Sequence, residues 1–219
     1  MSVVVTVGQS GNNSTWSLPK KLLTHHSPFF AAALDGNFAE ANSKAVSLPD
    51  EKPMVFEAFV QWLYIGHFKV EHGKVSSEVL CAEAWILGNK IACLPFQDHA
   101  MLQLINLHEK DCIDPTVLEL AYTATTENSK LRSWALAQFM CDSFTLKSSD
   151  ADDWQELSKK LDGFAVDVIN CLRSKRMDSH PNPYTYPGQF LEVIGDHEAT
   201  SFLEWATDIE NLENCAAYD

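Results

Sequence analysis

The stretch PMVFEAFVQWLYIG, residues 53–66, decides the fold. Its apolar residues recur with the 3.6-residue period of a helix that buries one face. A proline stands in the first turn, where its missing N–H leaves no bond unmade, and Gly66 ends the pattern. The spacing predicts a helix whose inward positions are Val55, Phe56, Phe59, Val60, Leu63 and Tyr64.

Two short extended segments at the start of the chain are predicted to pair. Val3–Gly8 is rich in β-branched residues, and Thr15–Leu18 is a second extended piece. The residues between them are mostly Gly, Ser and Asn, which are typical of turns. The pattern predicts a β-hairpin, and Ala45–Leu48 predicts a third strand that Pro49 closes.

Helices are predicted between and after these strands. A short one runs from Leu18 through Leu23, because Pro19 is tolerated in a first turn, and Ser27 caps another that begins at Pro28. The later helices are predicted at about Ser77–Ile91, Phe96–Leu107, after Asp114-Pro115, at Leu131–Phe144 and at Asp153–Leu172, with a short amphipathic piece at Phe202–Leu212. Residues 177–189 hold three prolines and predict no long regular element. The fold class is therefore α+β and mostly helical.

The charge of the chain excludes two classes of partner. Its 219 residues include 30 acidic and 16 basic side chains, for a formal net charge of -14. Such a chain repels phosphate backbones and anionic lipid, so we expect protein partners, with no direct nucleic acid and no membrane. Residues 177–219 hold nine acidic residues and no Lys or Arg, which predicts a separate segment. It is interpreted as a solubilising tail, with a docking segment for a basic protein surface as the alternative.

No part of the sequence predicts secretion or membrane insertion. The apolar start, Met1–Val7, lacks a basic region and breaks at Gly8, and no stretch approaches the ~18 apolar residues of a membrane span. The six cysteines show no C-x-x-C spacing, and several fall on apolar helical positions where a free thiol packs as a small hydrophobe. Reduced cysteines favour a cytoplasmic or nuclear location, or both.

The sequence contains no catalytic constellation. The eight histidines lack metal-ligand spacing, and the glycine patterns that cradle phosphates are absent. We therefore expect a protein that is not an enzyme and that has no catalytic residues, no cofactor and no metal. An unrecognised enzyme in the C-terminal part, around Cys141 and His180, is the alternative from another class.

A series of segments, taken in order, resembles a BTB/POZ domain. The segments are Val3–Gly8, Trp16–Leu23, Ser27–Phe30, Phe38–Glu40, Val46–Pro49, Phe56–Gly66, Leu87–Ile91 and Leu94–Phe96. The end of the predicted helix, Leu63-Tyr64-Ile65-Gly66, is similar to the family's Leu-Tyr-x-Gly. Pro19-Lys20 stands where many members have His-Lys, a variant that is similar to fungal members.

The resemblance implies an organisation in three parts. Residues 1–110 are expected to form the BTB/POZ fold, a small three-stranded sheet flanked by helices. Residues 115–144 are similar to the helical extension that follows the domain in filamentous-fungal members, which implies an α-helical extension over 111–176. Residues 177–219 are then the acidic, proline-containing segment with its short terminal helix.

The resemblance also implies a function, that of a non-enzymatic protein-protein interaction module. In some members a hydrophobic-x-Glu motif before the third strand docks a cullin, and Phe38 and Glu40 fit this pattern. This implies a BTB-type scaffold or adaptor that recruits substrates to a cullin-RING ubiquitin ligase. The alternative is a self-associating transcriptional or assembly scaffold without cullin binding.

A homodimer is the second partner that the resemblance implies. Many members carry a helix and a strand before the hairpin, and these swap between the two partners. Here only Met1 and Ser2 precede the first strand, which argues against the swapped form. A dimer through the helix that carries Leu18, Leu22 and Leu23 is compatible with the sequence.

Overall fold

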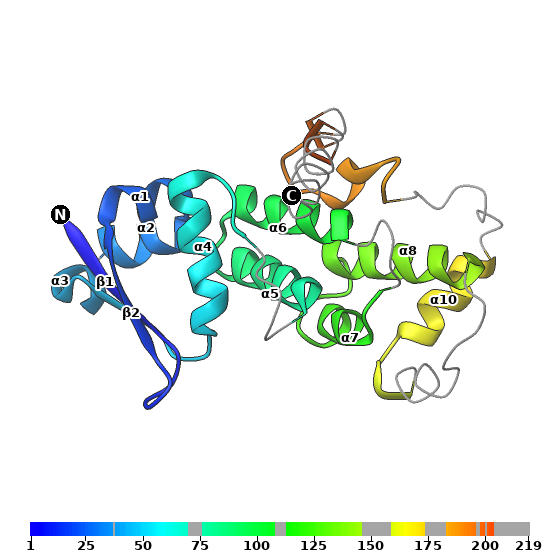
Figure 1. The fold of residues 1–219 in the computed structure, drawn as a ribbon. Helices are drawn as coiled ribbons and strands as arrows, with labels where there is room; N and C mark the ends of the chain where they lie inside the picture. Colours follow the sequence, from blue (N-terminus) through cyan, green and yellow to red (C-terminus); the bar gives the residue numbers. More distant parts are fainter. Residues whose placement is uncertain are drawn as a thin grey trace, which may run out of the picture.

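The computed structural model describes residues 1–36, 38–69, 76–107, 113–145, 159–173, 183–195, 198–199 and 201–203. Figure 1 shows an elongated arrangement, with the sheet at one end of the molecule and the helices that follow it extending away. Across the described ranges, no helix is long and apolar enough to cross a membrane.

The sheet has three strands in the order β2-β1-β3. They are β1 (Ser2–Val7), β2 (Ser14–Pro19) and β3 (Ala45–Leu48). β1 pairs antiparallel with β2 and parallel with β3. Val3, Val5 and Val7 are completely buried, as expected of a strand that turns alternate side chains toward the core. The predicted hairpin and third strand are confirmed.

The first helix begins later than predicted. Leu18 and Pro19 belong to β2, where Leu18 pairs with Val3, and α1 spans Lys20–His26. The prediction of a helix from Leu18 was wrong because the strand pairing continues to Pro19, whose backbone is extended. α2 (Pro28–Asp35) begins as predicted, with the N–H of Phe30 donating to the Ser27 Oγ at 3.2 Å.

α4 spans Pro53–Ile65 and is the helix that the opening stretch of sequence predicts. Gly66 ends it with φ +77°, a conformation that glycine adopts without steric cost. Along its buried face the rings of Phe59 and Trp62 stack 6.3 Å apart. The predicted face was wrong at Tyr64, which is 58% exposed because it lies at the edge of the apolar stripe in the last turn.

Four helices follow α4. They are α5 (Ser77–Lys90), α6 (Leu94–Leu107), α7 (Pro115–Thr123) and α8 (Lys130–Thr145). α5 and α6 pack closely where Gly88 faces Gln97, since a Cβ at Gly88 would lie 3.0 Å from the Gln97 side chain. The predicted cap of α7 is confirmed, because the Asp114 carboxylate accepts a hydrogen bond from the N–H of Thr116 at 2.7 Å.

The helix predicted from Asp153 to Leu172 is interrupted. Residues 151–158 lie outside the described part of the chain, residues 161–163 form a turn, and α10 spans Phe164–Arg173. The prediction of one continuous helix was wrong because the apolar period runs on across Gly163, whose φ of +81° ends regular helix.

Three polar side chains join α7, α8 and α10. Arg132 Nη2 donates to Asp167 Oδ2 at 2.9 Å, and the Tyr122 hydroxyl donates to the same oxygen at 3.0 Å. The Arg132 guanidinium lies over the Tyr122 ring, 4.1 Å from its centroid. Burial, and then the charge of Asp167, raise the pKa of Tyr122, so its hydroxyl stays protonated and able to donate.

The C-terminal segment returns to the middle of the molecule. Its described part contains turns and the 3-10 helix η1 (Pro187–Phe190), which contacts α6 and α8. Figure 1 shows this segment lying over the ends of these two helices. Of the predicted terminal helix Phe202–Leu212, residues 202–203 are helical, and residues 204–212 lie outside the described part.

Candidate protein-interaction site

Phe38 and Glu40, the residues predicted to dock a partner, lie beside the third strand. α3 spans Ala39–Ser43, and Phe38 is its N-cap residue. The Phe38 side chain is 59% exposed, whereas phenylalanine is usually buried. Glu40 stands in the first turn of α3 and is half-buried. The structure therefore places an exposed ring and a carboxylate two residues apart on one element.

Backbone hydrogen bonds fix α3 to the central strand of the sheet. The N–H of Lys44 donates to the Glu40 carbonyl at 2.8 Å, and the Lys44 carbonyl accepts from the N–H of Val4 at 3.0 Å. Lys44 itself is left-handed, with φ 55° and ψ 34°, which ends α3 and turns the chain into β3. Because the backbone is already held, a partner that binds here would order little of it.

An ion pair holds the chain that leads into this site. Lys20 Nζ lies 2.6 Å from Asp35 Oδ1 and donates to the Leu34 carbonyl at 2.7 Å. The Lys20 side chain is 23% exposed, so the pair is partly screened by water. These contacts attach the C-terminal end of α2 to the start of α1, and α2 ends three residues before Phe38.

The three leucines predicted to lie at a dimer interface have different environments. Leu18 is 3% exposed and Leu23 is completely buried, so both belong to the core of the protomer. Leu22 is half-buried and packs against that core, which leaves part of its side chain on the surface. The exposed residues of α1 are Lys21 and His25. Dimerisation through this helix stays a prediction, for which Leu22 is the leucine with accessible surface.

Apolar side chains on β1 and α2 are also exposed in this N-terminal part. Val4 on β1 is 43% exposed, and Phe29 on α2 is 38% exposed. The alternation of side chains along β1 predicts that Val4 is exposed, because it lies between the buried Val3 and Val5. The sequence does not predict the exposure of Phe29, because the adjacent Phe30 is the same residue type and is completely buried.

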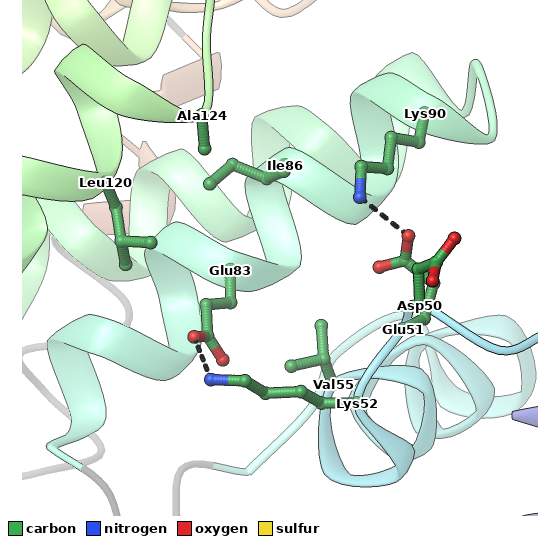
Figure 2. Close-up of a pocket in the computed structure, with 9 residues that line it drawn as sticks. All are labelled: Asp50, Glu51, Lys52, Val55, Glu83, Ile86, Lys90, Leu120 and Ala124. Carbon is green, nitrogen blue, oxygen red and sulfur yellow. Dashed lines mark hydrogen bonds and ion pairs between the residues drawn. The ribbon is translucent and has the colours of Figure 1, made fainter. Parts of the chain in front are cut away.

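A small pocket lies away from these residues, between the start of α4, α5 and α7 (Figure 2). Two ion pairs cross it, with Lys52 2.5 Å from Glu83 and Lys90 2.7 Å from Glu51. Its volume of about 170 Å³ is below the ~300–1,000 Å³ usual for small-molecule sites. None of the residues predicted to bind a partner lines it. The lining residues are Asp50, Glu51, Lys52, Val55, Glu83, Ile86, Lys90, Leu120 and Ala124.

The residues of the enzyme alternative are only partly within the described structure. Cys141 lies on α8, where burial, and then the charge of Asp142, raise its pKa. Its thiol is therefore protonated at neutral pH and a poor nucleophile. His180 lies outside the described residues. Among the residues that the structure describes, no group of three His, Cys, Asp or Glu side chains could hold a metal ion.

Comparison with known families identifies the part of the chain that carries Phe38 and Glu40. The family model of the BTB/POZ domain matches residues 3–90, which extend from β1 to the end of α5. A search of curated protein sequences found no match. The mixed three-stranded sheet with its flanking helices is the fold that the family implies. Residues 3–90 are a BTB/POZ domain, and the chain therefore contains a protein-interaction module.

Proposed function

We propose that the protein is an adaptor that recruits substrates to a cullin-RING ubiquitin ligase in the cytoplasm or nucleus. The cullin would dock on the edge formed by Phe38 and Glu40, named here the α3 edge. The observation that carries this proposal is the exposure of the Phe38 ring at the start of α3, with Glu40 in the first turn of that helix.

The chemistry of the α3 edge suits a docking contact. Burying the Phe38 ring in an apolar pocket of a partner would contribute about 2 kcal/mol. The Glu40 carboxylate would accept a hydrogen bond from a polar or cationic group of the partner beside that pocket. An aromatic anchor next to an oriented polar group is the arrangement found in interface hot spots.

The arrangement of the molecule leaves a second surface for a substrate. The α3 edge is at the sheet end, whereas α7, α8 and α10 lie along the rest of the molecule (Figure 1). A cullin on the α3 edge would therefore leave these later helices uncovered. We assign substrate binding to the helical extension on this ground.

The test is a binding assay between the full chain and purified cullin N-terminal domains. We expect Phe38→Ala to weaken binding at least tenfold, and Phe38→Ala combined with Glu40→Lys to abolish it, because both the anchor and the acceptor are lost. Tyr64→Ala and Glu57→Lys are the matched controls, since they change another exposed ring and another exposed acid, both on α4. Absence of cullin binding by the wild-type chain, or equal binding by Phe38→Ala, would reject the adaptor proposal.

A self-associating scaffold without cullin binding is the second candidate function. The exposure of Val4 and Phe29 favours it, because a contact between two copies would bury these apolar side chains. In this version Leu22 contributes the accessible part of its side chain to the contact between two copies.

A further inference from the structure

A buried carboxylate on α6 holds the C-terminal segment through its backbone. Asp98 is 0% exposed. Its Oδ1 accepts a hydrogen bond from the N–H of Glu192 at 2.5 Å, and its Oδ2 accepts from Val193 at 2.7 Å and Ile194 at 2.9 Å. Three successive backbone donors thus converge on one side chain that lies more than ninety residues earlier in the sequence.

Apolar and polar contacts surround this clamp. Phe190 and Leu191, just before the three donors, are 3% and 4% exposed. The Gln189 carbonyl accepts a hydrogen bond from Lys130 Nζ at 2.6 Å, which ties the segment to α8. The segment therefore binds as a peptide does, with two large apolar side chains buried and the backbone hydrogen-bonded to the surface that receives it.

The polar groups of this contact can form hydrogen bonds whether the segment is bound or released. A helix face that is permanently part of a core is usually apolar, whereas here the buried group is a carboxylate. Uncovered, Asp98 would be hydrated, and the three N–H groups of the segment would also bond to water. Covered, all of these groups have partners. Release of the segment thus leaves no polar group without a hydrogen bond.

We propose that the face of α6 and α8 around Asp98 is a peptide-binding site, which residues 187–195 of the chain occupy in cis. The site takes an extended segment with two adjacent large apolar residues followed by three successive free backbone N–H groups. A partner protein that presents such a segment displaces residues 187–195. This site is separate from the α3 edge and does not depend on cullin docking.

The probe for this proposal is the synthetic peptide PGQFLEVIG, residues 187–195, labelled with fluorescein and titrated with the full chain. In the wild-type chain the tethered segment competes at an effective concentration of about millimolar, so the peptide binds weakly. Val193→Pro removes the middle donor of the tethered copy. We expect this variant to bind the wild-type peptide at least tenfold more tightly than the wild-type chain does, by fluorescence anisotropy.

Two controls distinguish the site from a general loosening of the protein. Adding Asp98→Asn to Val193→Pro removes the charged acceptor, and we expect peptide binding to be lost. Adding Glu57→Gln instead changes an exposed acid on α4 and leaves binding unchanged. A peptide that carries proline in place of Val193 should not bind the Val193→Pro chain.

Hydrogen exchange of the amides of residues 192–194 gives a second readout that needs no variant. A saturating excess of the peptide should accelerate their exchange in the wild-type chain, because the tethered segment is displaced. This measurement tests the displacement of residues 187–195 even if Val193→Pro does not fold. The proposal is overturned by unchanged exchange, by equal peptide binding to Val193→Pro with and without Asp98→Asn, or by no binding to a folded Val193→Pro chain.

Discussion

At the scale of single residues, the informative positions are polar side chains whose partners lie far away in the sequence. Asp98 and Arg132 are each almost fully buried, and each is paired with a group on a later segment. Both lie among apolar helical positions, and no neighbouring residue in the sequence predicts that they are buried. The sequence does not predict their burial, because a buried charge is recognised only when the segment that covers it is placed.

His99 gives the protein a predicted dependence of stability on pH. The ring is 6% exposed and lies between Phe68, at a centroid distance of 5.2 Å, and Phe202, at 5.3 Å. Burial, and then the nearby His67, lower the pKa of His99 to about 4. The unfolded chain, with an ordinary histidine pKa near 6.5, binds the proton more readily. Stability is therefore complete above pH 6.5 and falls as the pH drops toward 4.

The expected loss from this residue is about 3 kcal/mol at pH 4, from about 1.4 kcal/mol per pKa unit. Urea unfolding of the wild type and of His99→Phe at several pH values measures it. The free energy of unfolding of His99→Phe should fall less steeply between pH 6.5 and 4. Identical pH dependence of the two proteins would contradict the assigned role.

At the scale of helices and strands, the sequence predicts the elements that have a regular apolar period. It does not predict where such a period continues across the end of an element. The hairpin, β3 and α4 follow from alternation, helical period and a terminal glycine. The end of β2 was placed too early because Pro19 favours a helix start as well as the edge of a strand. The break before α10 was missed because the apolar period continues through Gly163.

Gly163→Ala is predicted to destabilise the extension through two separable effects. The residue has φ +81°, and a Cβ there would lie 2.9 Å from Arg132 Nη2, which would push the guanidinium away from Asp167. Gly11→Ala is the matched control, because Gly11 has φ +92° and an added Cβ would meet nothing within 4 Å. Backbone strain alone costs about 1 kcal/mol, so Gly11→Ala should show that loss.

We expect Gly163→Ala to lose about 2–3 kcal/mol, since the weakened ion pair and cation–π contact add to the backbone cost. Thermal unfolding of both variants beside the wild type measures the difference. Equal losses for the two glycines would show that the contact with Arg132 contributes nothing.

At the scale of the whole molecule, the resemblance to the BTB/POZ family implied the fold of the N-terminal domain. The sequence did not predict how that domain contacts the segments that follow it. The family match covers residues 3–90, and the boundaries expected at 110 and 176 stay predictions. α7 packs on α5, and residues 192–194 bond to Asp98, so contacts cross both expected boundaries. The resemblance implied the boundary at 110, and a shift in charge predicted the one at 176. Neither a family resemblance nor the charge along a chain reports the contacts that cross a boundary.

Self-association is the prediction that belongs to this scale. If the scaffold version of the function holds, the full chain should have the mass of a dimer in light scattering at high concentration. Leu22→Glu should shift it to a monomer, because a charge would replace the accessible leucine of α1, while Tyr64→Glu on α4 leaves the mass unchanged. A monomeric mass of the wild-type chain at every concentration would reject this version.

The hydrogen bonds that run from Val4 through Lys44 to Glu40 have a thermodynamic consequence. They make α3 part of the folded sheet, so the α3 edge does not exist in the unfolded chain. A partner that binds this edge therefore binds the native state alone, and its occupancy adds to the free energy of unfolding of the domain. At a free partner concentration one hundred times its Kd, the addition is about 2.7 kcal/mol. The half-life of the protein in a cell would then report how much of it is in complex.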